Sequence, residues 1–222
     1  MSDPGWPFAS VVGPFDSVGE IVAALALSQL GVRERNGSNR GIEVDYYRET
    51  GGGRRIADDD GKGPPWCAYF RSALLVEAAR RNWEFPYPLI RSGAARHHWQ
   101  RVPTGTSALV DGVGVELVYH VRRGDIFAQP DEVLIGGAMV RSRGGKPRDV
   151  RRIYDGKAAQ GHVATVIGVD REPGAEALIC VGGNSSGAGH SRTSGAVAWE
   201  VYRPGTKQWD CMAGVSTLES VR

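Results

Sequence analysis

The sequence predicts an α+β fold in which N-terminal helices pack on a small antiparallel sheet. Apolar residues with helical spacing occur mainly before Gln100, and apolar runs typical of short strands follow it. Helices that precede strands along a chain are typical of α+β domains. Thirty-one glycines and twelve prolines require many turns, which disfavours a purely helical bundle.

The composition indicates one globular domain over residues 1–222. The chain is 41% hydrophobic and 23% charged, as is ordinary for a globular protein. We expect a core over about residues 15–205, an N-terminal arm over residues 1–14 and a basic insertion over about residues 130–160. The formal net charge of +2 gives no case for nucleic acid as a partner.

Four helices are expected, and the first has the clearest boundaries. Ser17 and Glu20 have the spacing of a capping box, and Gly31 is a natural stop. The other three are expected at about Ile42–Arg48, Trp66–Asn82 and Ser92–Gln100. Strands are expected at Gly124–Ala128, Gly161–Val169, Ala177–Gly183 and Ala196–Tyr202.

The helix that follows Pro64 and Pro65 begins close to Cys67. Proline is unfavourable inside a helix but suits its first turn or the residues just before it. Backbone N–H groups in the first turn have no intrahelical partner, and their partial positive charge favours a thiolate over a thiol. Cys67 is therefore a candidate nucleophile.

Of the five histidines, His162 is the candidate base for this cysteine. His162 lies at the start of one expected strand and Asn184 at the end of the next, and their midpoint falls on Pro173 in the connecting turn. In a simple antiparallel hairpin the two residues lie opposite each other, whereas a slip of one residue would separate them. An asparagine amide beside an imidazole holds the tautomer that accepts a proton from a thiol.

Four motifs occur along the chain in this order: Pro65-Trp66-Cys67-Ala68-Tyr69-Phe70, Arg123-Gly124-Asp125-Ile126, Gly161-His162-Val163-Ala164 and Gly182-Gly183-Asn184-Ser185. Through them the chain resembles the CHAP family of cysteine, histidine-dependent amidohydrolases/peptidases. This family is related to NlpC-type cell-wall peptidases within the papain-like fold. The resemblance covers about residues 18–203, and Leu30–Glu34 followed by Asn39 is similar to one phage- and bacteria-borne branch.

The resemblance implies a papain-like fold and a role for each matching residue. Cys67 would be the nucleophile, His162 the general base and then acid, and Asn184 the orienting residue. The implied reaction is hydrolysis of an amide bond in peptidoglycan through a thioester acyl-enzyme. The family often has an acidic residue two positions before the asparagine, and Gly182 occupies that position here. A carboxylate is therefore either absent from the site or supplied from elsewhere.

We expect no cofactor and no metal. Asp58-Asp59-Asp60-Gly61 resembles the calcium loop of some CHAP enzymes, with Asp58 and Asp60 as ligands, but no later carboxylate completes such a loop. His97 and His98 point about 100° apart on a helix, which favours a surface or packing role over metal ligation. Cys180 lies in an apolar run and is expected to be inert, although a disulfide with Cys211 stays open.

Several roles stay open at this stage. Trp66 either lines the substrate groove or anchors its helix in the core. The oxyanion hole is expected to use the backbone N–H of Cys67, with Tyr46 or Tyr47 as candidates for a second donor. The basic residues within 141–152 either attract anionic wall polymers or form a solvated loop.

The expected function is a Cys-His-Asn peptidoglycan hydrolase, either an endopeptidase or an N-acetylmuramoyl-L-alanine amidase. The chain starts without a recognisable signal peptide and has no membrane-spanning segment, so we expect synthesis in the cytoplasm and action on the cell wall after release or injection. A phage lysin released by a holin, a tail-associated lysin and an antibacterial effector with an immunity protein all fit. The alternatives are a non-catalytic wall-binding module and a cysteine hydrolase of another amide.

Overall fold

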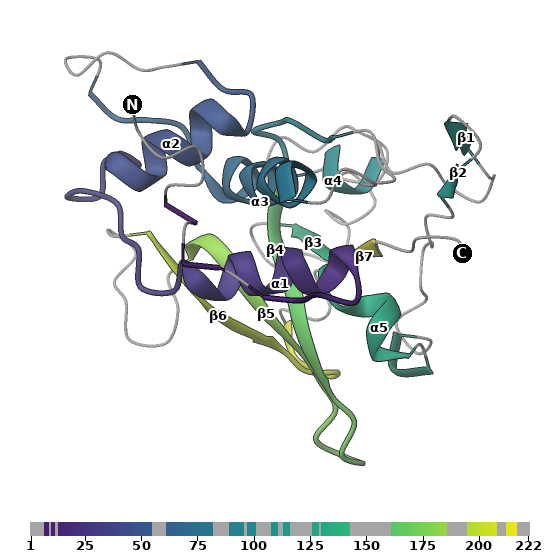
Figure 1. Ribbon diagram of the computed structural model, residues 1–222. Helices are drawn as coiled ribbons and strands as arrows, with labels where there is room; N and C mark the ends of the chain where they lie inside the picture. The colour runs from purple at the N-terminus through teal and green to yellow at the C-terminus, as the bar shows by residue number, and fades with distance from the viewer. Residues whose placement is uncertain are drawn as a thin grey trace.

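A computed structural model describes thirteen segments of the chain (Figure 1). They are residues 7–8, 10–11, 13–54, 61–81, 89–95, 97–100, 108–110, 113–115, 126–128, 130–142, 161–185, 195–207 and 212–216. Within them no helix is long and apolar enough to cross a membrane.

Helices come first along the chain, and most strands follow. The helices are α1 (Val18–Ser28), α2 (Ile42–Thr50), α3 (Cys67–Arg81), α4 (His97–Gln100) and α5 (Asp131–Leu134), with a 3-10 helix at Ile126–Ala128. The strands are β1 (Ala108–Val110), β2 (Val113–Val115), β3 (Ala138–Ser142), β4 (Gly161–Asp170), β5 (Ala177–Ser185), β6 (Ala196–Tyr202) and β7 (Met212–Ser216). Five strands form an antiparallel sheet in the order β6-β5-β4-β3-β7, which confirms the α+β class.

Helix α1 begins where its capping residues predict. The Ser17 side chain accepts a hydrogen bond from the Glu20 backbone N–H at 3.1 Å, and the Glu20 carboxylate accepts one from the Asp16 N–H at 2.8 Å. These bonds satisfy N–H groups that the first helical turn leaves unpaired. The helix ends at Ser28, and Gly31 follows in the left-handed region at φ +87°.

Helices α1 and α3 lie over β4 and β5 and bury their apolar faces against one side of the sheet (Figure 1). The core there includes Val22, Leu25, Phe70, Leu74, Val181 and Val197. Each such side chain contributes about 1.5–3 kcal/mol when fully buried. Burial of these faces is therefore what fixes α3, and with it Cys67, against the sheet.

A second core lies on the other face of the sheet and contains Ile126, Leu134, Met139, Val166, Leu178 and Val215. The strand expected at Gly124–Ala128 is a 3-10 helix at Ile126–Ala128. A short apolar run predicts burial but does not distinguish a strand from a helical turn, and Ile126 is fully buried by the turn.

The expected basic insertion over residues 130–160 contains core elements. Helix α5 and strand β3 lie inside this range, and Arg141 belongs to β3. The sequence did not predict β3 because a five-residue strand flanked by glycines and arginines has little apolar alternation. The rest of the expected insertion, residues 143–160, lies outside the described residues.

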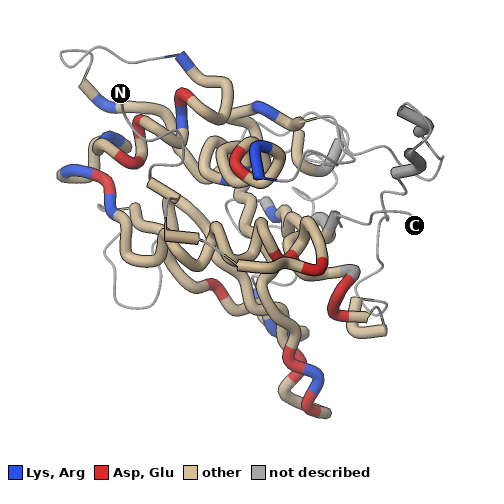
Figure 2. The backbone as a smooth tube through the Cα atoms, viewed as in Figure 1, with Lys and Arg blue, Asp and Glu red and all other residues tan. Residues whose placement is uncertain are grey.

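Strands β4 and β5 form the expected hairpin, with Ala164 opposite Gly182 and Val166 opposite Cys180. Charged residues gather at the tip of this hairpin and around α2, whereas α1 and the strands carry few (Figure 2). The ionisable residues that do lie in the strands, among them His162 and Glu200, are therefore exceptions to be explained.

Candidate active site

Cys67 is the first residue of α3, where the sequence predicts it. The first hydrogen bond of the helix runs from the Phe70 N–H to the Trp66 carbonyl at 2.8 Å. The side chain is nearly covered, with 6% of the residue exposed. Its place at the helix N-terminus favours the thiolate, as expected from the sequence.

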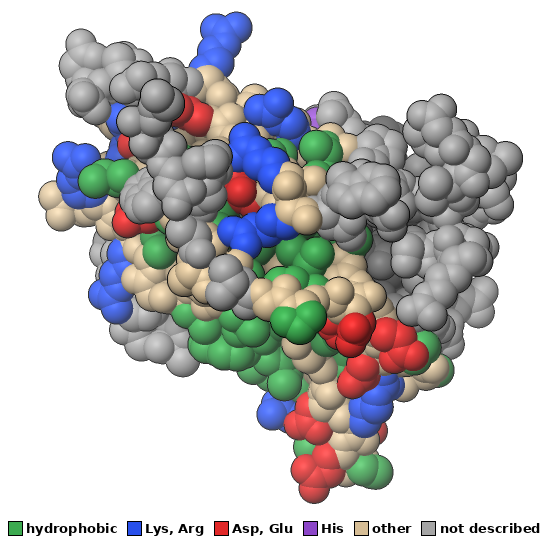
Figure 3. Space-filling view, viewed as in Figure 1, with side chains coloured by type: hydrophobic (Ala, Val, Ile, Leu, Met, Phe, Trp, Pro, Cys, Tyr) green, Lys and Arg blue, Asp and Glu red, His purple; other side chains and the backbone are tan. Residues whose placement is uncertain are grey.

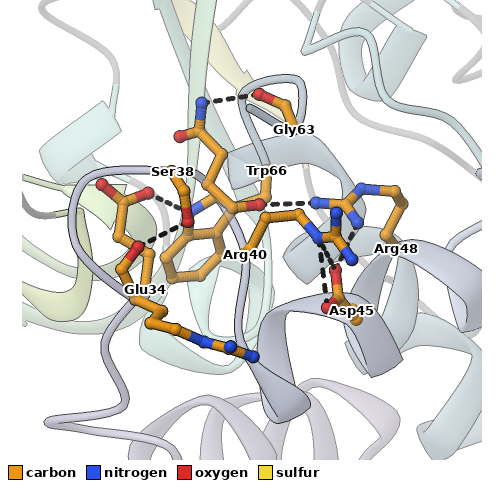
Figure 4. A network of polar contacts seen from close by, with 9 residues as sticks. Glu34, Ser38, Arg40, Asp45, Arg48, Gly63 and Trp66 are labelled. Atoms are coloured by element: carbon orange, nitrogen blue, oxygen red, sulfur yellow. Dashed lines mark hydrogen bonds and ion pairs between the residues drawn. The ribbon is translucent and has the colours of Figure 1, made fainter. Parts of the chain in front are cut away.

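Trp66 anchors the start of α3 in the core and does not line a groove. Trp66 is fully buried, and its ring stacks on the Tyr47 ring with the two ring centroids 6.0 Å apart. The indole N–H donates to the Glu34 carboxylate at 3.2 Å (Figure 4). Glu34 also accepts from the Gly195 N–H at 2.8 Å, so one buried carboxylate joins the helix start to the start of β6.

The segment that leads into α3 is held by the loop between α1 and α2. The Asn39 side chain donates to the Gly63 carbonyl at 2.8 Å, and the Gly63 N–H donates to the Ser38 carbonyl at 2.7 Å. The Asn39 carbonyl in turn accepts from Arg48 of α2 at 2.6 Å (Figure 4). These contacts fix the backbone that carries Cys67 before the helix begins.

His162, on β4, is hydrogen-bonded to the Cys67 thiol. Burial alone would raise the pKa of Cys67, but the hydrogen bond and positive charge of His162 lower it below its usual value. The Val163 backbone N–H also donates to the sulfur and lowers the pKa further. The structure therefore brings together the two residues that the sequence singles out, and their contact favours the ionised form of the cysteine.

The second ring nitrogen of His162 is held by Glu200 of β6. Its Nε2 lies 2.8 Å from Glu200 Oε1 and 3.1 Å from Oε2. Burial alone would lower the pKa of His162, but the charge of Glu200 and the hydrogen bonds to Cys67 and Glu200 raise it to about 9. Burial raises the pKa of Glu200, but the charge and hydrogen bond of His162 bring it below its usual value. Glu200 thus stabilises the charged form of His162 beside Cys67.

Asn184 does not take the expected orienting position, because Glu200 occupies Nε2 of His162. The β4–β5 pairing ends at Ala164 and Gly182, two residues short of the level of Asn184. Asn184 itself adopts φ +55° in the left-handed region, which takes it out of the extended strand conformation. The predicted register holds from Val166 opposite Cys180 to Ala164 opposite Gly182, whereas a bulge shifts it by one residue nearer the turn. The turn of the backbone after Gly182 was not predicted.

Gly182 leaves the space through which Glu200 reaches His162. A Cβ atom at Gly182 would lie closer to Glu200 Oε1 than real side chains pack, and 3.0 Å from His162 Nε2, which is tighter than most real contacts. The absent acid at Gly182 is thus compensated by a carboxylate from the next strand. The sequence carried two clues to Glu200: the glycine at the acidic position, and a charged residue inside the apolar strand Ala196–Tyr202.

Gly182→Ala is expected to lower kcat/KM about 100-fold, since a displacement of about 1 Å in a catalytic group has an effect of that size. The added methyl group would push Glu200 away from His162. Amide hydrolysis and far-UV circular dichroism measure the effect and the fold. Gly168→Ala is the matched control, because among the described residues a Cβ there meets Ile179 alone, at an ordinary 3.8 Å. Equal activity in both variants would contradict the role assigned to Gly182.

His98 has the packing role that was one of the two expectations. It is 1% exposed, and its Nε2 lies 3.2 Å from the Ala68 carbonyl and 3.3 Å from the Ser72 hydroxyl. Burial, with Arg71 nearby, lowers the pKa of His98 to about 3, so the ring is neutral in the fold. Its neighbour His97 contacts the Ser92 hydroxyl at 2.6 Å. His98 therefore fixes the first turns of α3 from behind.

His98→Gln is expected to destabilise the fold by about 2–3 kcal/mol at pH 7, because it disturbs a buried, hydrogen-bonded site. The wild type should also lose stability as pH falls from about 6.5 towards 3, since the unfolded chain binds a proton that the folded state does not. Urea denaturation at pH 7 and pH 5 measures both effects. The pH effect should shrink in His98→Gln and persist in His97→Gln; the reverse result would contradict the assignment.

Other candidates are placed away from the thiol or outside the described residues. The Tyr46 and Tyr47 hydroxyls donate to Glu77 and Gln29, at 2.7 and 2.6 Å, so neither is a second oxyanion donor. Cys180 is a free, buried thiol in the structure and not part of a disulfide, and burial raises its pKa. Asp58, Asp60 and Cys211 fall outside the described segments. Where the structure is described, no three His, Cys, Asp or Glu side chains are grouped to hold a metal.

Comparisons with protein-family models, with curated proteins and with solved structures give no match for this chain. The assignment of the site therefore depends on its own geometry.

Proposed function

We propose that this protein is a papain-like cysteine hydrolase of the CHAP type that cleaves an amide bond in peptidoglycan. The observation that carries the proposal is the hydrogen-bonded chain Cys67–His162–Glu200, whose nucleophile lies at a helix N-terminus. Its reaction class follows from these three residues. The peptidoglycan substrate is proposed from the resemblance of the four sequence motifs.

In the first half of the reaction, the Cys67 thiolate attacks the amide carbonyl carbon. The backbone N–H of Cys67 at the start of α3 supplies a donor for the oxyanion that develops. The His162 imidazolium then gives its proton to the amide nitrogen, the C–N bond breaks and the amine leaves. A thioester to Cys67 and a neutral His162 remain.

In the second half, neutral His162 removes a proton from water, and the oxygen of that water attacks the thioester carbon. The C–S bond breaks and returns Cys67 as a thiolate beside the imidazolium. The product acid releases its proton to solvent as a carboxylate. Glu200 keeps the ring oriented throughout and stabilises it in its charged form, in the manner of the acid in a serine protease triad.

Mass spectrometry of digested sacculi tests the proposal and also reports the scissile bond. New stem-peptide amines would indicate an endopeptidase, and free lactyl carboxylates on the glycan would indicate an amidase. Cys67→Ser should give neither product, and Cys180→Ser should give the wild-type product at the wild-type rate, because Cys180 lies in the core. If sacculi stay unchanged while a protein substrate is cleaved, the substrate is an amide other than peptidoglycan. Wall binding without any cleavage would support the binding-module alternative.

A further inference from the structure

A second set of side chains is hydrogen-bonded to the carboxylate of Glu200. The Tyr202 hydroxyl donates to Glu200 Oε2, and the Ser185 hydroxyl donates to Oε1. Both carboxylate oxygens are thus bonded to protein donors as well as to His162. A buried carboxylate with several donors is held in one orientation and in its ionised form.

Arg141 of β3 extends this set by one more charge. It lies directly opposite His162 in the β3–β4 pairing, so the two side chains leave the sheet on the same face. Its Nε donates to the Tyr202 hydroxyl at 3.1 Å, and its guanidinium carbon lies 5.9 Å from the centre of the Tyr202 ring. Tyr202 therefore accepts from Arg141 and donates to Glu200, which links the two charges through one hydroxyl group.

The linked groups alternate in charge: Arg141 positive, Glu200 negative, His162 positive and Cys67 negative. They come from four elements, β3, β6, β4 and α3. Burial alone would lower the pKa of Arg141, but Tyr202, Glu200 and Cys67 raise it, so the guanidinium interacts favourably with both anions. Among the described residues, Tyr202 of β6 and Cys180 of β5 are further titratable groups that interact with Glu200, and burial raises the pKa of each of them.

We infer that Arg141 and Tyr202 are positioning residues, which hold Glu200 ionised and directed at His162 and so keep Cys67 a thiolate near neutral pH. This inference rests on the proposed hydrolase and adds two residues to it. Arg141 acts through its charge, since a positive charge favours both Glu200 and Cys67 in their anionic forms. Tyr202 acts through its hydroxyl group, which links Arg141 to the carboxylate without changing the net charge.

The pH dependence of Cys67 alkylation by iodoacetamide tests the role of Arg141 without any substrate. Mass spectrometry of the Cys67 peptide separates this thiol from Cys180 and Cys211. In Arg141→Gln the midpoint of alkylation should move about 1 unit to higher pH, because loss of a nearby positive charge raises the pKa of an acid. Arg141→Lys keeps the charge and should restore most of the shift. Arg171→Gln is the matched control, because Arg171 is an exposed arginine at the hairpin tip that pairs with Asp131.

Tyr202→Phe tests the hydroxyl group and retains the packed ring. We expect kcat to fall about 10-fold with KM unchanged, and the alkaline limb of the kcat profile to move to lower pH. An unchanged alkylation midpoint in Arg141→Gln, or unchanged kcat and pH profile in Tyr202→Phe, overturns the inference for that residue. If the wild-type midpoint itself lies near 8.5, the usual value for cysteine, the Cys67–His162 ion pair and the proposed function fail instead.

Discussion

Cys67→Ala is expected to remove hydrolytic activity to background, a loss of roughly a millionfold in kcat by analogy with nucleophile deletions in other acyl-transfer enzymes. The reason is that no other described thiol or hydroxyl group lies in hydrogen-bond contact with the imidazole of His162. Release of muropeptides from purified sacculi, followed by mass spectrometry, measures the loss.

Folding should survive this change, which makes the result interpretable. Alanine removes only a sulfur at a helix start that Trp66 and its neighbours already hold in the core. The imidazolium loses its thiolate partner, so the pKa of His162 should fall. Cys180→Ala serves as the matched control and should retain activity. Hydrolysis by Cys67→Ala at the wild-type rate would end the cysteine mechanism.

Glu200→Gln is expected to lower kcat by about 10²–10⁴-fold, the range for loss of an orienting carboxylate or a general acid–base group. It should also move the alkaline limb of the kcat profile to lower pH. The limb reports loss of the His162 proton, and the charge of Glu200 is the main favourable influence that places the pKa of this group near 9. Hydrolysis rates between pH 5 and pH 10 measure both effects.

The stability of the fold should also depend on the His162–Glu200 pair. A histidine whose pKa rises on folding stabilises the protein fully below its unfolded value of about 6.5, and this stabilisation is lost as pH rises through about 9. Glu200→Gln should therefore reduce the loss of stability over this range.

Asn184→Gly is the matched control for Glu200→Gln. Glycine tolerates the φ of +55° at this position and removes only the amide, so the backbone is preserved. We expect an effect much smaller than that of Glu200→Gln. A larger loss in Asn184→Gly than in Glu200→Gln would restore the asparagine as the orienting residue.

Features that depend on local sequence were predicted well. The capping pair Ser17 and Glu20, the helix that begins at Cys67 and the β4–β5 hairpin each follow from neighbouring residues. His162 was predicted as the base because it lies in a hairpin whose two strands are separated by only a short turn in the sequence. In these cases the turn chemistry and the apolar spacing specify the geometry.

The features that were missed depend on contacts between distant segments. Glu200 reaches His162 only because Gly182 of the strand between them has no side chain, and that requires the register of three strands at once. In the sequence Arg141 resembles part of a basic loop, and only the pairing of β3 with β4 places it opposite His162. Asn184 would lie opposite His162 if the hairpin stayed extended, but the backbone leaves the extended conformation after Gly182.

The strand that supplies Glu200 is unevenly supported. Its first residues are bonded on both sides, since Val197 exchanges backbone hydrogen bonds with Gly31 and Val32, and Ala196 pairs with Ser185 of β5. Further along, β6 pairs only with β5 among the described strands. Trp199 and Val201 are about half exposed there, and hydrophobic surface is visible over this end of the sheet (Figure 3).

Amide hydrogen exchange in native proteins proceeds through local openings, which begin where the backbone is least protected. In this molecule such an opening would release the outer half of β6 and carry Glu200 away, while Cys67 and His162 stay assembled on α3 and β4. The free energy needed to displace Glu200 from the site would then be lower than the free energy of global unfolding. Mild denaturant would abolish turnover before it melts the core.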